Sequence, residues 1–294
     1  MQQDKSTNQI VKPNFLYIGA AKAGSSWIYE ILREHPEVFV PVAKEIEFFN
    51  KHYNKGLDWY LPYFQAGDRA KAVGELCHDY FLQEETAHKI KKHLPDVRLI
   101  SCLREPVDRT ISNFSYAKTL TLAPNASFEA FAFREKVISY SDYYYNLRPY
   151  FELFPTDNIL ILFYDDLKKD PKHFARRIYE FIGVDYEFTP EVLHKKVLKT
   201  GSPRWVWLAH TAFRIGKKLR NRGLNTIVGS VKKSILFQKL LYTNLENMPE
   251  ISEDSILELR ALYQKRLTGL PELIGQPLPA GWGYKFISPE AVSQ

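Results

Sequence analysis

The segment Tyr17–Ser26, YIGAAKAGSS, contains two glycines, a lysine and two serines at the spacing of a phosphate-binding loop. The common form of that loop is G-x-x-x-x-G-K-[ST], in which the lysine follows the second glycine. Gly19 and Gly24 keep the spacing, but Ser25 stands where the lysine is expected, and Lys22 lies in the middle of the loop. The residues predict an anion site, and the chemistry of the ligand must explain the position of the lysine.

A second group of anion-binding residues occurs in LISCLREPVDRTISNF. Arg104 ends an apolar run, and Ser112 follows eight residues later, inside the expected next helix. A guanidinium at the end of a strand can bind a phosphate through two hydrogen bonds, and a helix serine can add a hydroxyl donor. Arg104 alone could equally form a structural ion pair. The loop upstream favours a second phosphate contact.

Asp165 and Asp166 follow the apolar run ILILFY, where a kinase or NTPase would carry an aspartate for Mg²⁺. Such an enzyme also needs a loop lysine on the β- and γ-phosphates, and that lysine is missing here. Two aspartates before a lysine-rich turn can instead cap a helix. Kinase or NTPase chemistry is therefore the weaker interpretation.

The elements that must position these residues alternate between strands and helices. Short apolar runs predict strands within 14–20, 72–81, 97–104 and 159–167. Helical spacing and helix-start signals predict helices within 25–36, 85–96, 105–117, 143–155 and 170–184. This alternation predicts an α/β fold, P-loop-like and three-layered, with a central, mostly parallel sheet of about five strands flanked by helices.

The chain of 294 residues is predicted to form one domain, of which residues 1–13 are a flexible N-terminal tail. Cys77 and Cys102 lie in apolar runs, which favours buried free thiols over a disulfide or a zinc site. The polar N-terminal segment lacks the apolar core of a signal peptide, and no run of about 18 apolar residues occurs. A soluble, cytoplasmic protein is the expectation.

Positive charge is concentrated in residues 192–245. The whole chain has 40 Lys and Arg against 34 Asp and Glu, and this segment holds twelve of the basic residues and none of the acidic ones. The remainder therefore carries 28 basic against 34 acidic residues, a net charge of −6. The favoured interpretation is a helical lid or a wall of the acceptor cleft, with peripheral membrane contact through 205–245 as an alternative. Nucleic acid is not an expected partner, because no recognised binding module accompanies the charge.

Five motifs, in their order and spacing, resemble the sulfotransferases that use 3′-phosphoadenosine 5′-phosphosulfate (PAPS). They are YIGAAKAGSSWIYEIL, HPEV, AKEIEFF, GELCHDYF and LREPVDRTISNF. The resemblance is strongest to the branch that contains heparan-sulfate sulfotransferases and their soluble bacterial relatives. It covers about residues 14–183 and returns weakly at LPELIGQPLPAGW. It implies transfer of the sulfuryl group of PAPS, in line, to an acceptor hydroxyl or amine, which leaves adenosine 3′,5′-bisphosphate.

The resemblance also implies which residues bind the donor. In that family the first loop binds the 5′-phosphosulfate, a role that falls here on Lys22, Ala23, Gly24, Ser25 and Ser26. The strand-end arginine and the helix serine bind the 3′-phosphate, which implies Arg104 and Ser112. The segment KKVLKTGSPRW resembles a loop that closes over the 3′-phosphate. This segment adds four donor-site candidates that are weaker than those of the first loop: Lys199, Gly201, Ser202 and Arg204.

PAPS explains the displaced lysine, because it has no β- or γ-phosphate for a lysine after the second glycine to reach. Sulfuryl transfer develops negative charge on the oxygen that bridges sulfur and the 5′-phosphate. Lys22 beside that oxygen would stabilise the charge as a preorganised donor, without a metal. A metal-free site is the expectation.

Two residues compete as the base that accepts the acceptor's proton. AKEIEFF resembles the KE-x-x-FF signature, which implies Glu45, with Glu47 as a less favoured stand-in where some relatives carry histidine. His78 is the second candidate, because small-molecule sulfotransferases often carry their catalytic histidine at the corresponding strand end. Leu76 stands where heparan-type relatives have a lysine, so one polar contact to the sulfuryl group is in doubt. Glu45 is favoured over His78, and the two could act together.

The acceptor class is a small molecule or a carbohydrate. Aromatic residues expected to line its cleft are Tyr53, Trp59, Tyr80, Phe81 and the run Tyr143–Tyr145. Two alternatives to the sulfotransferase remain: the kinase or NTPase, and a non-catalytic nucleotide-binding protein with the same fold. The absence of a lysine at Leu76 keeps the second of these open.

Overall fold

Five strands form a central sheet in the computed structural model, which describes residues 10–120, 125–194, 201–203, 242–244 and 251–286. The strands are β1 (Phe15–Gly19), β2 (Val38–Phe39), β3 (Ala72–Leu76), β4 (Arg98–Leu103) and β5 (Ile159–Phe163). They lie in the order β2-β3-β1-β4-β5, and every neighbouring pair is parallel. The predicted α/β fold with a parallel sheet of about five strands is confirmed.

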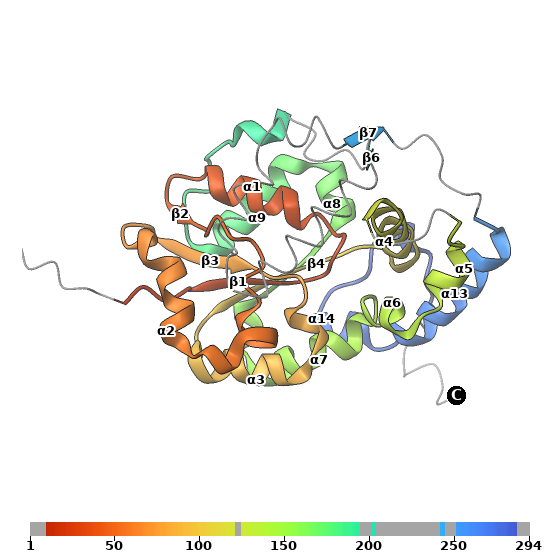
Figure 1. Ribbon diagram of the computed structural model, residues 1–294, viewed down its shortest axis with the longest axis horizontal. Helices are drawn as coiled ribbons and strands as arrows, with labels where there is room; N and C mark the ends of the chain where they lie inside the picture. Colours follow the sequence, from red (N-terminus) through yellow and green to blue (C-terminus); the bar gives the residue numbers. More distant parts are fainter. Residues whose placement is uncertain (1–9, 121–124, 195–200, 204–241, 245–250, 287–294) are drawn as a thin grey trace, which may run out of the picture.

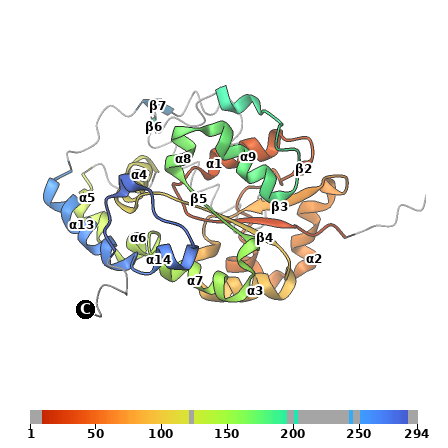
Figure 2. The same cartoon turned by 180° about the vertical axis from the view of Figure 1, so that it is seen from behind.

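Helices cover both faces of the sheet (Figures 1 and 2). One face carries α1 (Ser25–Glu34), α8 (Tyr164–Lys169) and α9 (Pro171–Ile182). The other carries α2 (Leu57–Tyr60), α3 (Glu84–His93) and α7 (Tyr143–Leu153). Because both faces are covered, the strands are apolar and buried along nearly their whole length.

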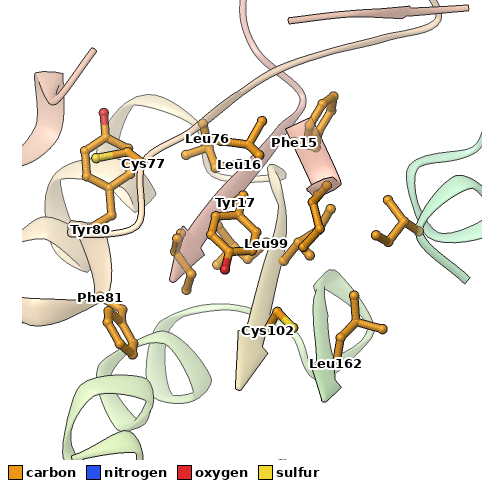
Figure 3. Close-up of a cluster of buried hydrophobic side chains, with 14 of the residues drawn as sticks. Phe15, Leu16, Tyr17, Leu76, Cys77, Tyr80, Phe81, Leu99, Cys102 and Leu162 are labelled. Carbon is orange, nitrogen blue, oxygen red and sulfur yellow. The ribbon is translucent and has the colours of Figure 1, made fainter. Parts of the chain in front are cut away.

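The main core lies between the sheet and these helices. Figure 3 shows side chains of four strands packed together, among them Leu16, Leu76, Leu99 and Leu162. Both cysteines belong to this core, and both are free and buried, as the sequence predicts.

A second hydrophobic cluster holds a group of helices beyond the carboxyl ends of β1 and β4 (Figure 1). Its helices are α4 (Pro106–Leu120), α5 (Phe128–Ala132), α6 (Glu135–Ser139) and α13 (Glu253–Arg266). Phe114 of α4 is fully buried against Phe128 and Phe131 of α5. This packing fixes α4, which the site requires, at the edge of the sheet.

Short helices complete the described part of the chain. They are a π-helix at Phe48–His52, α14 (Leu270–Ile274) and 3₁₀ helices at Tyr53–Lys55, Leu61–Gly67, Tyr80–Leu82, Thr156–Asn158, Glu191–His194 and Ala280–Trp282. The C-terminal turn returns to the sheet, where the ring of Trp282 packs edge-on against that of Phe163 at 5.5 Å between centroids.

Two local predictions need correction. The strand predicted within 72–81 ends at Leu76, after which Tyr80–Leu82 forms a 3₁₀ helix. The backbone N–H of Cys77 still donates to the Tyr17 carbonyl at 2.9 Å, but the chain then turns away from the sheet. The strand predicted within 159–167 likewise ends at Phe163, and Tyr164–Lys169 forms the helix α8. The strand without a predicted range is the two-residue β2, which is too short to give an alternating or apolar pattern of its own.

Most of the predicted lid at 192–245 and most of the tail at 1–13 lie outside the described residues, as does the 205–241 part of the segment predicted to contact membranes. Within the lid segment, β6 (Gly201–Pro203) pairs antiparallel with β7 (Tyr242–Asn244). The division into one domain with a tail and a lid stays a prediction. Across the described ranges, no helix has the length and apolar character needed to span a membrane.

Candidate functional site

The loop after β1 leads directly into the N-terminus of α1. The Ala20 N–H donates to the Cys102 carbonyl at 2.9 Å, which fixes the start of the loop on β4. Gly24 has φ 90°, in the left-handed region that glycine tolerates, and a Cβ there would lie 2.9 Å from Leu167 Cδ2. The first turn of α1 contains no acidic residue. Its free N–H groups and the helix dipole therefore favour an anion.

Lys22 projects from this loop onto α4. Its ammonium lies 4.0 Å from the centroid of the Tyr116 ring, a cation–π contact. Its backbone carbonyl accepts a hydrogen bond of 3.3 Å from Arg104 Nη1. Burial lowers the pKa of Lys22, and together with the nearby charges of Arg104, Lys44 and Arg109 it brings that pKa to about 8. Positive charge thus gathers around the loop, as an anion site requires.

Arg104 follows β4 directly and belongs to the same group. Its Nη2 lies 3.9 Å from an Asp108 carboxylate oxygen, and its guanidinium carbon 4.9 Å from the Tyr164 ring centroid. Its Nε is buried and has no hydrogen-bond partner among the described residues. The Tyr143 hydroxyl donates to its carbonyl at 2.7 Å and fixes the backbone. The guanidinium therefore retains donors for a ligand.

Ser112 shares a face of α4 with residues that contact the loop and Arg104. It is four residues after Asp108, which pairs with Arg104, and four before Tyr116, which contacts Lys22. Residues four apart on a helix are neighbours, so Ser112 lies between these two contacts. The backbone of β6, with Gly201 and Ser202, also packs against α4. Lys199 and Arg204 lie outside the described residues.

Glu45 and His78 form a pair just beyond the carboxyl end of β3. His78 Nδ1 lies 2.9 Å from Glu45 Oε1, and its Nε2 lies 3.3 Å from Asp79 Oδ1. Glu45 has φ 64°, and its N–H donates to the Leu76 carbonyl at 3.0 Å, which ties this turn to β3. Burial lowers the pKa of His78, but the charge and hydrogen bond of Glu45 and the charge of Asp79 outweigh it, so the net shift is upward. The structure brings the two predicted base candidates into direct contact.

Glu47 makes a different ion pair. It also has a left-handed backbone, with φ 60°, but its carboxylate pairs with Lys51 one turn later. Lys51 Nζ lies 3.8 Å from Asp79 Oδ2, so Glu47 reaches His78 only through this lysine and Asp79.

Sequence reasoning missed two ionisable residues in this region. Lys44 places its ammonium 3.3 Å from the Ser25 hydroxyl and 3.4 Å from that of Ser26. Glu75, on β3 and 1% exposed, has its pKa raised to about 7 by burial. The only signal in the sequence for Lys44 is its position before Glu45, whereas Glu75 is a charged residue inside an apolar run.

Asp165 and Asp166 have structural partners. Asp165 Oδ2 accepts a hydrogen bond of 3.0 Å from Trp282 Nε1, and Asp166 Oδ2 lies 3.5 Å from Arg177 Nη1. In the part of the chain that the structure describes, no group of three or more His, Cys, Asp or Glu is arranged to hold a metal ion.

The aromatic residues expected to line the acceptor cleft divide into two sets. Tyr80, Phe81 and Tyr143 are at most 1% exposed and belong to the core, so their assignment to an open cleft is wrong. Tyr53 and Trp59 are half-buried beside the π-helix, Tyr144 is half-buried on α7, and Tyr145 is exposed. A strand-like apolar context could not distinguish a core aromatic from a cleft aromatic.

Comparison with known proteins relates this chain to sulfotransferases. The profile of the sulfotransferase domain matches residues 12–201. Mouse heparan sulfate glucosamine 3-O-sulfotransferase 3B1 is 32% identical over 183 residues, 58% of this chain and 46% of that protein. Human bifunctional heparan sulfate N-deacetylase/N-sulfotransferase 3 is 25% identical over 293 residues, 91% of this chain and 31% of that protein. These matches confirm the resemblance predicted from the sequence, and the chain spans less than half of either relative.

Solved structures share the fold. A sulfotransferase from Alicyclobacillus acidocaldarius superposes with a TM-score of 0.66 at 22% identity, covering 93% of this chain and 100% of that one. Mouse sulfotransferase SULT7A1, complexed with PAP, superposes with a TM-score of 0.53 at 16% identity, covering 87% and 84%. These likenesses support the P-loop-like arrangement of sheet and helices.

Proposed function

Because the chain belongs to the family defined by the sulfotransferase domain, we propose that it transfers the sulfuryl group of PAPS to an acceptor hydroxyl or amine. One observation carries the proposal. Lys22 and Arg104, held together by the hydrogen bond from Arg104 to the Lys22 carbonyl, lie at the same edge of the sheet as the Glu45–His78 pair. An anion site beside a candidate base is what transfer from an anionic donor to a hydroxyl requires.

The donor would lie across the carboxyl ends of β1 and β4. The 5′-phosphosulfate would contact the loop and the first turn of α1 through Lys22, Ala23, Gly24, Ser25 and Ser26. The 3′-phosphate would contact Arg104 and Ser112, with Gly201, Ser202 and Arg204 as further candidates. Two observations support this assignment of the two phosphates. Arg104 Nε has no hydrogen-bond partner among the described residues, and the first turn of α1 contains no acidic residue.

Lys22 would stabilise charge on the leaving oxygen. As the bond from sulfur to the bridging oxygen breaks, that oxygen gains negative charge, which a nearby ammonium stabilises. Binding of the anionic donor would also raise the lowered pKa of Lys22 and keep the ammonium protonated. We expect the reaction to proceed in the presence of EDTA.

Glu45 would accept the acceptor's proton, with His78 as its hydrogen-bonded partner. The 2.9 Å contact allows either a carboxylate base oriented by His78 or an imidazole base oriented by Glu45. We favour Glu45, because Asp79 contacts the other nitrogen of His78 at 3.3 Å. With both ring nitrogens held by carboxylates, His78 has no free position for a proton from the acceptor.

The acceptor is proposed to be a carbohydrate or a small molecule. The names of the relatives, which act on heparan sulfate, support a glycan. The half-buried aromatics Tyr53 and Trp59 offer apolar surface for a sugar ring or a small molecule. A cytoplasmic location is a further prediction.

The decisive experiment has two stages. Calorimetry with adenosine 3′,5′-bisphosphate in EDTA tests the donor site, and we expect binding at low micromolar concentration or tighter. Incubation with ³⁵S-labelled PAPS and a panel of glycans and small hydroxyl compounds then tests transfer. Binding without transfer to any acceptor would favour the non-catalytic alternative, whereas magnesium-dependent ATP turnover would favour the kinase or NTPase.

A further inference from the structure

We propose that Lys44 is a second donor-binding cation, which contacts non-bridging oxygens of the 5′-phosphosulfate together with Ser25 and Ser26. This inference rests on the proposed function and adds a residue to its site. The starting observation is that one ammonium lies within 3.4 Å of two hydroxyls on the first turn of α1. All three groups therefore converge on the end of the helix that favours anions.

The contacts of the Lys44 ammonium are neutral. Among the described residues, no carboxylate forms an ion pair with it; its contacts are the two serine hydroxyls and the Tyr29 ring, whose centroid lies 5.9 Å away. Burial lowers the pKa of Lys44, although the charges of Glu45 and Glu30 oppose the shift. A buried ammonium is stable when an anion or several acceptors surround it, so this geometry points to an anionic ligand.

The backbone explains how one segment can serve both halves of the site. Glu45 bonds to the Leu76 carbonyl and has a left-handed φ of 64°, so the chain turns sharply there. Lys44 points toward Ser25 and Ser26, while the next residue points toward His78. Adjacent residues thus hold a donor contact and the proposed base.

Lys44 also supplies a positive charge that Leu76, the last residue of β3, cannot supply. The side chain of Leu76 is 2% exposed and apolar, so it offers no polar contact. Because the Glu45 N–H bonds to the Leu76 carbonyl, Lys44 is one residue from the backbone at that strand end. The segment before Glu45 therefore places a lysine next to the apolar end of β3.

The proposed step balances without another reactant. The acceptor oxygen forms a bond to sulfur, and the bond from sulfur to the bridging oxygen breaks. The leaving phosphate takes the electron pair beside Lys22, and Glu45 takes the acceptor's proton. Lys44 remains protonated throughout and holds oxygens that carry charge before and during transfer.

The test compares three variants of the full chain. Lys44→Met keeps the length of the side chain without its charge, Lys44→Arg keeps a charge, and Lys71→Ala removes an exposed lysine at the amino end of β3. We expect Lys44→Met to weaken PAPS binding in calorimetry by about tenfold or more and to lower kcat/KM at least as much. Lys44→Arg should recover part of both losses, and Lys71→Ala should match the wild type.

The outcomes separate this inference from the proposed function. If wild-type protein binds and turns over PAPS while Lys44→Met keeps the same Kd and kcat/KM, the role of Lys44 is overturned and the sulfotransferase stands. If the wild type neither binds nor turns over PAPS, both proposals fall. A structural role alone would lower the melting temperature of Lys44→Met, whereas a folded variant with weakened PAPS affinity supports the donor contact.

Discussion

The proposed donor side and the proposed acceptor side of the site use charge in opposite ways. On the donor side, Lys22, Lys44 and Arg104 gather around one loop. Within the described ranges of the chain, the carboxylate that pairs with this group is Asp108, 3.9 Å from Arg104. Burial, and after it the charges of Arg104 and Lys44, lower the pKa of Lys22. Such a cluster is stabilised when an anion binds.

On the acceptor side, charges of opposite sign alternate. Glu45, His78, Asp79, Lys51 and Glu47 follow one another in a chain of contacts at 3.8 Å or less. Each carboxylate in this chain already has a cationic or histidine partner, so the groups are paired without a ligand. One side is therefore suited to binding an anionic donor, and the other to moving a proton between paired groups.

Removing the central cation of the donor side should have the largest effect. We expect Lys22→Ala to lower kcat/KM for PAPS by about 10² or more, the scale of a preorganised group that stabilises developing charge. Steady-state assays with labelled PAPS measure the loss, and Lys71→Ala at the opposite edge of the sheet is the control. A fall of less than fivefold in Lys22→Ala would assign the leaving-group role to another residue.

Neutralising the acceptor side at Glu45 should have the next largest effect. We expect Glu45→Gln to lower kcat by about 10², because an amide cannot accept the proton, while PAP binding stays close to that of the wild type. Glu47→Gln, two residues later and paired with Lys51, is the matched variant and should lose less. Wild-type turnover by Glu45→Gln would remove Glu45 as the base and assign the proton to His78.

The lowered pKa of Lys22 predicts a pH dependence that belongs to the donor side. Because the pKa is about 8 in the free protein, the ammonium loses its proton as pH rises through 8. We expect kcat/KM for PAPS to fall about tenfold per pH unit above that value. Lys22→Arg, whose guanidinium stays protonated, should remove this alkaline decline at the cost of a lower rate. If the alkaline decline of kcat/KM is unchanged in Lys22→Arg, the titrating group is not Lys22.

The local structure of the proposed donor side was largely predictable from the sequence, because it is built from local elements. A strand, a glycine turn and a helix follow one another without interruption, so the types and spacing around Lys22 and Gly24 sufficed. Arg104 was found for the same reason, at the end of an apolar run. The sheet followed from the alternation of such runs with helical segments.

The acceptor side was only partly predictable, since its contacts join distant segments. Glu45 and His78 were each named, but their 2.9 Å contact depends on the turn that bonds Glu45 to the end of β3. Lys44 was missed because nothing local shows that its ammonium reaches α1. Tyr80 and Phe81 were misassigned, since core and cleft aromatics have the same sequence pattern.

Replacing Asp165 tests whether the carboxyl edge of the sheet contains a third functional group besides the donor and acceptor sides. We expect this substitution to have the smallest effect on activity. Asp165 follows β5 at the same edge, yet its carboxylate accepts a hydrogen bond from Trp282. Because an asparagine oxygen can accept that bond, Asp165→Asn should keep kcat/KM within about twofold and lower the free energy of unfolding by about 1 kcal/mol or less. Sulfate-transfer assays and denaturant unfolding measure both quantities. A catalytic loss of about 10² in the folded variant would instead indicate a metal ligand and return the kinase or NTPase to consideration.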